Sequence, residues 1–278
     1  MSALTFVAAQ LLRALPRARV SHTVGRLAEH RWSEPVGRIA VGLYASAYGV
    51  NLAECHDQPW ESFDAFFTRP LRPGARPIVS PPNVLVSPAD GRLDALEHID
   101  STLSLSIKGN TYSVGELLDH QDEARRFEGG AAAVVYLSPR DYHRVHAPVS
   151  GTLHTIRSLP GDYFPVNAIG IRHVPKLLAR NRRVAFSIDT ERGRVTVVMV
   201  AAIVVGRITA AGIDAPDVPL GEHSMGCPIA RGDELGVFHL GSTAVLLIEA
   251  PVFEAWLEEG PAIQMGMPLA RVRPTRTS

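Results

Sequence analysis

The chain has 278 residues, 46% hydrophobic and 20% charged, which is enough to bury the core of one large globular domain or two small ones. A formal net charge of +0 gives no overall field that would favour nucleic acid as a partner. Two cysteines, Cys55 and Cys227, are too few for a disulfide framework or a thiolate metal site. Lysine occurs only at Lys108 and Lys176, so an enzyme holding pyridoxal phosphate would have just those two candidates.

Apolar spacing predicts helices in the N-terminal part of the chain. Residues 4–12 place apolar side chains near one face of a helix that must end around Pro16. A second helix could be lined by Val24, Leu27 and Trp32. No segment reaches the roughly 20 apolar residues of a membrane-spanning helix, and we expect no signal peptide, since a small-residue cleavage site is lacking.

The same N-terminal part is basic. Between Met1 and Arg38 it holds six arginines against Glu29 and Glu34, a net charge of +4. A basic amphipathic segment can lie in the membrane interface. The alternative is a pair of helices packed on the main domain with a solvated arginine face, and the pattern alone favours this alternative.

A proline-rich linker, Pro70 to Pro82, precedes a change to strand patterns. The predicted strands are short, rich in Val, Ile and Leu, and bounded by Gly, Pro, Asp or Asn. They are Val84–Val86, Leu93–Leu96, Leu103–Ile107, Ala133–Leu137, Gly151–Ile156, Val184–Ile188, Val195–Val205 and Val245–Ile248. Short helices are predicted at Val114–His120 and Val174–Arg180. The predicted fold is therefore α+β, with a mostly β, barrel-like or sandwich-like domain behind a helical segment.

Two turns in this β region resemble each other. The segments 87–93 and 146–153 each combine Pro and Gly in a turn that opens a strand. Two similar sheet corners could place Asp90 near His146.

Asp90, His146 and Ser242 form a candidate catalytic group. A histidine within hydrogen-bond reach can take the proton of a serine hydroxyl, and a carboxylate behind the histidine stabilises the imidazolium. His143, three residues before His146, is a candidate proton donor. An extended chain would direct His143 and His146 to opposite faces, whereas a helix or tight turn would let them share one. The flanking prolines favour a turn or loop, so both arrangements stay open.

From Phe63 to Ser242 the chain resembles phosphatidylserine decarboxylase of the bacterial, membrane-associated type. The most specific motifs are Tyr-x-x-x-x-Tyr-His-Arg-Val-His, ending at His146, and Leu-Gly-Ser-Thr around Ser242. Other matching strings are 66–72, 87–91 and 160–167. Residues 207–230 depart most from the family pattern, which puts the details of the lipid-headgroup surface in doubt.

The resemblance implies a proenzyme that cuts itself between Gly241 and Ser242. The Ser242 hydroxyl would attack the Gly241 carbonyl, helped by the Asp90–His146 pair. The products would be a β chain, 1–241, and an α chain, 242–278, whose Ser242 becomes a covalent pyruvoyl group. That group would form a Schiff base with the substrate amine and would serve as the only cofactor, without a metal or pyridoxal phosphate.

The implied reaction converts phosphatidylserine to phosphatidylethanolamine in phospholipid biosynthesis. The implied partners are this lipid, the membrane surface and the paired α and β chains, which could dimerise further. The implied location is peripheral, on the cytoplasmic side of the cell membrane. Because a lipid substrate needs a route to the site, the resemblance favours membrane docking by residues 1–70, with 71–278 as the catalytic domain.

Two other functions fit parts of the pattern. A serine hydrolase can use Asp, His and Ser in this order, but Gly-x-Ser-x-Gly is absent and Thr243–Ile248 is predicted to be a strand. A carrier domain would suit the paired turns, yet Lys108-Gly109-Asn110 does not resemble a lipoyl or biotinyl acceptor.

Overall fold

The computed structural model of the chain describes residues 16–56, 59–79, 81, 84–107, 109–166, 168–203, 207–249, 253–256 and 262–272. The predicted helix at residues 4–12 lies outside this part. The described helical elements are α2 (Arg17–Ala28), α3 (Glu34–Tyr48), η1 (Leu52–Glu54), α4 (Phe63–Phe67), α5 (Val114–Leu118), α6 (Gln121–Ala124), η2 (Arg125–Phe127), α7 (Ala168–His173) and α8 (Leu177–Arg180).

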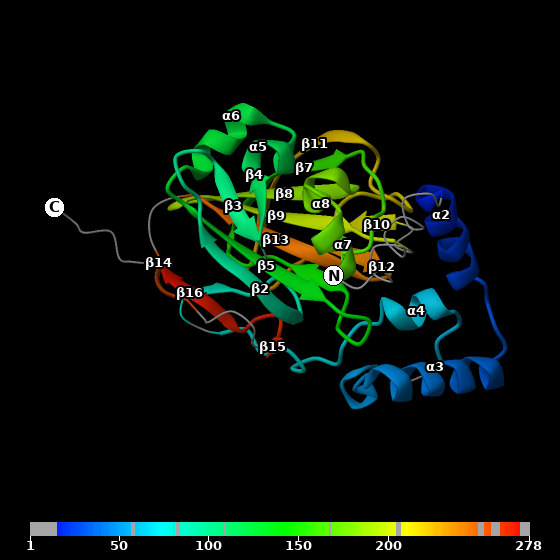
Figure 1. Cartoon of the computed structure of the whole chain (residues 1–278). Coiled ribbons are helices and arrows are strands. Elements are labelled where there is room, and N and C mark those ends of the chain that lie inside the picture. The colour runs from blue at the N-terminus through cyan, green and yellow to red at the C-terminus, as the bar shows by residue number, and fades with distance from the viewer. Residues whose placement is uncertain are drawn as a thin grey trace.

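An antiparallel sheet of eight strands lies at the centre of the fold (Figure 1). In spatial order its strands are β11 (Gly221–Ile229), β7 (Gly151–Leu159), β8 (Arg183–Thr190), β9 (Gly193–Ala201), β13 (Ser242–Ile248), β5 (Ala131–Leu137), β2 (Gly91–His98) and β15 (Ala262–Ile263). All seven residues of β13 are buried, which explains its nearly continuous apolar sequence. The predicted combination of a β-rich domain and N-terminal helices is confirmed.

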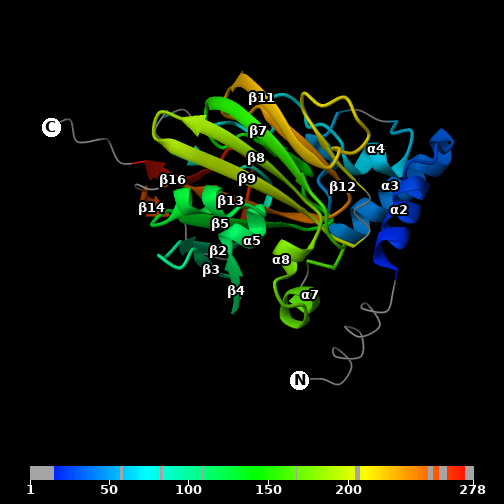
Figure 2. The same ribbon diagram turned by 90° about the horizontal axis from the view of Figure 1, so that it is seen from above.

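Three smaller sheets complete the β structure. They comprise β1 (Val84–Val86), β16 (Pro268–Val272) and β14 (Phe253–Trp256); β10 (Arg207–Ala210), β12 (Glu234–His239) and β6 (Arg144–His146); and β3 (Ser104–Ile107) with β4 (Asn110–Ser113). Both views place α2, α3 and α4 at the end of the molecule where β10 and β12 lie, away from β14 and β16 (Figures 1 and 2).

Three neighbouring strands of the large sheet end at the same level and continue into the three-stranded sheet of β10, β12 and β6. The chain passes from β5 to β6, from β9 to β10, and from β12 to β13. Ser242 is paired with Leu137 on one side and Ala201 on the other. Since Leu137 and Ala201 are the last residues of their strands, Ser242 lies in the row where all three strands break.

The helix α3 begins and ends at clear signals. Ser33 is its N-cap with Pro35 in the first turn, and Gly49 ends it in the left-handed conformation, with φ of 72°. The face of α3 that carries Gly37, Val41 and Ala45 is buried. This helix was not among the predicted amphipathic segments.

The preceding helix differs from its prediction at Trp32. The helix α2 ends at Ala28, and the Trp32 indole nitrogen donates to the carbonyl of Trp60 at 2.7 Å instead of extending a helical stripe. Val24 packs against the core, whereas Leu27 is 68% exposed.

Candidate active site

Ser242 is held at the start of the central strand of the large sheet. Its side chain is 1% exposed, and its hydroxyl has no hydrogen-bond partner among the described residues. A buried hydroxyl without a partner costs free energy, so a folded chain seldom leaves one. Ser242, at the predicted cleavage position, is one of several such exceptions among the described residues.

Backbone strain precedes Ser242 by two residues. Leu240 has φ of 88°, a left-handed conformation that is costly for a residue with a branched side chain. The positive φ falls on Leu240 and not on Gly241, the glycine that follows it. A Cβ atom built on Gly241 meets no described atom within 4 Å, so there is open space beside the predicted scissile peptide.

The loop between β5 and β6 positions the two histidines. Backbone and hydroxyl groups of Ser138 both donate to the Asp141 carboxylate at 2.7 Å. Arg69, which is 3% exposed, donates to the carbonyls of Arg140 at 3.0 Å and Asp141 at 3.3 Å. The loop is therefore fixed by its own turn and by a buried arginine next to α4.

His146 is a neutral imidazole with a defined tautomer. Its Nδ1 lies 2.8 Å from the Gly232 carbonyl, which can only accept, so Nδ1 carries the proton. Nε2 is then the acceptor, and the Tyr142 hydroxyl donates to it at 3.1 Å. Burial lowers the pKa of His146, while the Gly232 hydrogen bond and the charges of Glu234 and Asp90 act in the opposite direction. Nε2 is thus a base that Tyr142 covers in this state.

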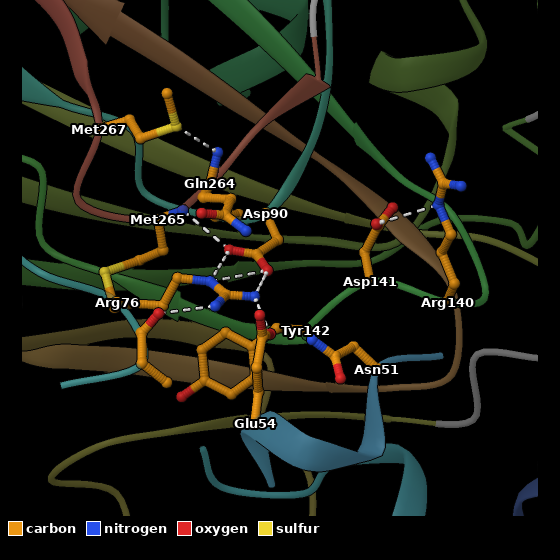
Figure 3. A network of polar contacts seen from close by, with 12 residues as sticks. Asn51, Glu54, Arg76, Asp90, Arg140, Asp141, Tyr142, Gln264, Met265 and Met267 are labelled. Carbon is orange, nitrogen blue, oxygen red and sulfur yellow. Dashed lines mark hydrogen bonds and ion pairs between the residues drawn. The ribbon is translucent and has the colours of Figure 1, made fainter. Parts of the chain in front are cut away.

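Asp90 lies close to His146 along the backbone but bonds to other groups. The amide of His146 donates to the Pro88 carbonyl at 2.8 Å, and the amide of Val86 donates to the Pro148 carbonyl at 3.1 Å. These bonds confirm that the two similar turns meet. The Asp90 carboxylate, however, accepts from Arg76 and from the amide of Met265 at 2.8 Å (Figure 3).

Asp90 and His146 therefore do not share a hydrogen bond, because the two ring nitrogens of His146 bond to Gly232 and Tyr142. Burial lowers the pKa of the His146 imidazole overall, and the Asp90 charge is a smaller contribution that opposes it. A negative charge at that place favours the imidazolium that forms when Nε2 accepts a proton.

His143 has different surroundings. It is 0% exposed, its ring centroid is 4.1 Å from that of Phe67, and its Nδ1 donates to the Asp141 carbonyl at 2.8 Å. Its Nε2 has no hydrogen-bond partner among the described residues. Burial lowers the pKa of His143 to about 3, with the Arg69 charge acting in the same direction and the Asp141 hydrogen bond opposing both. His143 is therefore neutral, with Nε2 as an unoccupied acceptor.

The segment that carries the two histidines is extended rather than helical, because Arg144–His146 forms β6. One histidine contacts Phe67 of α4 and the other contacts Tyr142, so they lie in separate environments.

Two residues near the site were missed from the sequence. Tyr142 stands inside the Tyr-His-Arg-Val-His string, and its position next to His143 could have drawn attention to it. Arg76 lies in the proline-rich linker, where no local signal distinguishes it from the other arginines.

A third polar array lies three residues before Ser242. His239 places Nδ1 2.8 Å from the Asp64 carboxylate and Nε2 3.2 Å from the Thr209 hydroxyl. Arg207 bridges Asp64 to Glu29 of the N-terminal helices, at 2.7 Å to each carboxylate. These bonds fasten α2 and α4 to the sheet that leads into Ser242.

Cavities lie at both ends of the molecule. One of about 450 Å³ separates α2 from β12 and is lined by His22, Arg26, Asp64 and His239 among others. A larger one of about 620 Å³ lies around the β8–β9 turn and Glu249, and none of Asp90, His143, His146 and Ser242 lines it. The smaller cavity is the more relevant one, because His239 joins it to the segment before Ser242.

Comparisons with known proteins agree with the motifs. The family model described as phosphatidylserine decarboxylase matches residues 63–271. A "Phosphatidylserine decarboxylase proenzyme" of Myxococcus xanthus is 37% identical over 92% of this chain and 95% of its own length. The proteins of that name from Psychrobacter arcticus and Saccharophagus degradans are 38% and 39% identical, over 95% and 96% of this chain and 98% and 97% of their own lengths. The chain belongs to the phosphatidylserine decarboxylase family.

Proposed function

We propose that this protein is a self-cleaving proenzyme that decarboxylates phosphatidylserine to phosphatidylethanolamine. The observation that carries the proposal is Ser242, a buried hydroxyl at a three-strand break that has no partner among the described residues. This serine lies within the stretch that matches a family whose relatives are named as proenzymes.

The first reaction is cleavage of the chain at Gly241–Ser242. The Ser242 hydroxyl attacks the Gly241 carbonyl while Nε2 of His146 takes its proton, and the amide becomes an ester. For this, the Tyr142 hydroxyl must release Nε2. The Asp90 charge stabilises the imidazolium. β-Elimination leaves a carboxyl end at Gly241 and dehydroalanine at 242, and water converts the latter to a pyruvoyl group with loss of ammonia.

The residues around position 242 fit a pyruvoyl group. The side chain there is buried and polar and lacks a partner, so an oxygen-bearing group of similar size loses no hydrogen bond. The pyruvoyl group would supply a ketone that can condense with the substrate amine and accept the electron pair left when carbon dioxide departs. In our proposal the pyruvoyl group is the cofactor, and it is formed from Ser242 of the chain itself.

His143 is proposed to move the proton in the second reaction. Its Nε2 is a buried acceptor with no partner among the described residues, so this atom is free to exchange a proton with a bound substrate. The same atom can then return the proton to the carbon that has lost carbon dioxide. The role differs from that of His146, whose Nε2 is already covered by Tyr142.

The two products of cleavage are proposed to stay together as a heterodimer. The α chain begins with β13, whose seven residues pair with β5 on one side and β9 on the other. Removing it would break both ladders of the large sheet. A cut before Ser242 therefore leaves the fold assembled.

Peripheral attachment to the cytoplasmic face of the cell membrane is proposed to use α3. Val36, Ile39 and Leu43 repeat at helical spacing on its outer face and are 53%, 64% and 68% exposed. Among the described helices none is long and apolar enough to cross a bilayer. An apolar stripe that meets solvent suits the interface of a membrane. Arg31 and Arg38 are paired with Glu61 and Glu34, so the stripe rather than their charge supports the proposal.

The intact mass of the denatured protein tests the cleavage. We expect two chains divided between Gly241 and Ser242, with the smaller one lighter by one ammonia than a peptide that starts with serine. Release of carbon dioxide from phosphatidylserine vesicles tests the second reaction. A single chain of the encoded mass after incubation with these vesicles would contradict the proposal.

A further inference from the structure

The guanidinium of Arg76 is buried between two carboxylates (Figure 3). Its side chain is 7% exposed. Nε lies 2.9 and 3.0 Å from the two oxygens of Asp90, and Nη2 lies 2.6 Å from Asp90 and 2.9 Å from Glu54. Nη1 donates to the Ala75 carbonyl at 2.8 Å. The fork of Arg76 thus fixes the plane of the Asp90 carboxylate as well as its position.

Asp90 needs such a partner. It is 5% exposed, and a buried carboxylate is costly unless opposite charge and hydrogen bonds compensate it. Apart from Arg76, the donor to its side chain is the amide of Met265, which belongs to the proposed α chain. Asp90 therefore joins a donor from each side of the proposed cleavage position, and Arg76 supplies the charge.

Contacts lead from this pair to His146. The Tyr142 side chain lies beside the Arg76–Asp90 pair (Figure 3), and both of their charges act on its phenol, whose pKa burial raises to about 12. The same phenol donates to Nε2 of His146, with the rings stacked at 5.6 Å. A shift of the Asp90 carboxylate would therefore change the field at Tyr142 and at the imidazole.

On the other side, Glu54 ends η1, which follows α3 closely in the chain. The amide of Arg72 donates to the Glu54 carbonyl at 2.8 Å, so the segment that carries Arg76 is also held through the backbone.

We propose that Arg76 is a positioning residue for self-cleavage: it holds the Asp90 carboxylate in the orientation that supports His146, and through Glu54 it ties this carboxylate to the segment behind α3. The inference rests on the proposed function, in which Asp90 assists the attack of Ser242. Arg76 itself touches neither the serine nor the scissile carbonyl in this role.

Arg194 provides a matched control. It is about as buried, at 10% side-chain exposure, and it is likewise forked to one carboxylate, Asp189, at 2.8 and 3.0 Å. Its second acid, Glu123, lies at 3.0 Å. Arg194 lines the larger cavity, away from the candidate residues. The loss of either arginine thus removes one guanidinium from two carboxylates, but only the loss of Arg76 affects Asp90. Without Arg194, Glu123 keeps Arg157 and Asp189 keeps His154, each at 3.4 Å.

The experiment measures the cleavage rate of freshly made full-length chains from the fractions of intact and cut protein, and measures the unfolding temperature in parallel. Arg76→Met is expected to cut about 100-fold more slowly, the order of loss seen when a catalytic group is misplaced by 1 Å. Arg194→Met is expected to lose comparable thermal stability but to cut at the normal rate. Arg76→Lys, which keeps the charge without the fork, should fall between. Glu54→Gln should slow cleavage less than Arg76→Met, since three of four carboxylate contacts remain.

The outcomes separate this inference from the proposed function. Normal cleavage by Arg76→Met, or equal slowing by Arg194→Met, would overturn the positioning role. Asp90→Asn is measured in the same experiment. If Asp90→Asn cuts slowly while Arg76→Met cuts normally, only the role of Arg76 is refuted. Normal cleavage by Asp90→Asn refutes the role of Asp90 and the inference with it. Failure of the unsubstituted chain to cut would instead contradict the proposed function. Decarboxylation per cut chain is expected to be unchanged in Arg76→Lys, which would confine the role to cleavage.

Discussion

The strand break around Ser242 and the outer face of α3 both contain side chains in unfavourable surroundings, but of opposite kinds. Near the break, polar atoms of Ser242 and His143 are buried and have no partner in the part of the chain that the structure describes. On α3, the apolar side chains of Ile39 and Leu43 meet solvent. Each arrangement lowers the free energy of unfolding, and most soluble proteins avoid both. In the proposed function, a bound substrate would supply the hydrogen bonds of the interior site, and a membrane interface would cover the helix.

Replacing Ser242 should have the largest effect and would break one side of this comparison. Ser242→Ala is expected to remain a single uncut chain with no decarboxylase activity, because the nucleophile and the precursor of the cofactor are both lost. Its unfolding temperature should be equal or higher, since the unpartnered hydroxyl is gone. Intact mass, carbon dioxide release and thermal unfolding check these three points. A clear loss of stability would show that the hydroxyl has a partner in solution.

Replacing His143 should separate the two reactions. His143→Ala is expected to cut normally and to decarboxylate roughly 10²- to 10⁴-fold more slowly, the usual range for the loss of a general acid or base. His146→Ala is the counterpart and should cut slowly. Rates are compared per pyruvoyl group, counted by reaction with a hydrazine reagent. Loss of cleavage in His143→Ala would move this residue into the first reaction.

Charge on the outer face of α3 should have a moderate effect. Transfer of one large aliphatic side chain into an apolar phase contributes about 1.5–3 kcal/mol. Ile39→Asp and Leu43→Asp together are therefore expected to weaken binding to phosphatidylserine-containing vesicles by at least about tenfold. Ser46→Asp adds charge to the same helix without removing apolar surface, and it should bind nearly as the unsubstituted protein does. Equal binding by all three would assign the stripe to another contact.

The effect that is smallest at neutral pH is the pH dependence of stability from His143. Its pKa is about 3 in the folded chain and about 6.5 when unfolded. Between these values the unfolded chain binds more protons, so the stability contributed by neutral His143 is present above pH 6.5 and is lost as the pH falls towards 3. The slope is at most about 1.4 kcal/mol per pH unit.

This slope can be measured by denaturant unfolding of Ser242→Ala, which stays one chain, with and without His143→Phe. The phenyl ring keeps a ring against Phe67. We expect His143→Phe to flatten the acid limb. Identical limbs would mean that His143 is solvated and protonates at its ordinary pKa.

Much of the β domain could be predicted from the sequence because its central strands are continuous apolar runs. The predicted strand Val84–Val86 agrees with β1, and the strand predicted from Val245 lies within β13. The strand β11 was missed because it is an edge strand with few β-branched residues. It contains Gly226 at φ of 63° and Pro228, and both are tolerated where one side of a strand needs no ladder.

The site was only partly predictable. The paired turns indicated that Asp90 and His146 would meet, and the backbone bonds confirm it. The sequence did not predict which groups bind the Asp90 carboxylate and the His146 ring. These groups, Arg76, Gly232 and Met265, lie apart in sequence from the residues that they bind. The same holds for the strain at Leu240, which arises where two sheets meet. The catalytic roles of Asp90, His143, His146 and Ser242 and the boundary at residue 70 stay predictions.

The position of β13 means that the proposed maturation affects refolding as well as the peptide bond. Before the cut, β13 is tethered to both of its neighbours, and the tether keeps their effective concentration high while the sheet assembles. After the cut, a denatured molecule becomes two separate chains that must find each other by diffusion. The attack geometry itself exists only when β5, β9 and β13 are already in register. A cut molecule therefore shows that its precursor once folded correctly. Unfolding by heat should be far harder to reverse after maturation than before it.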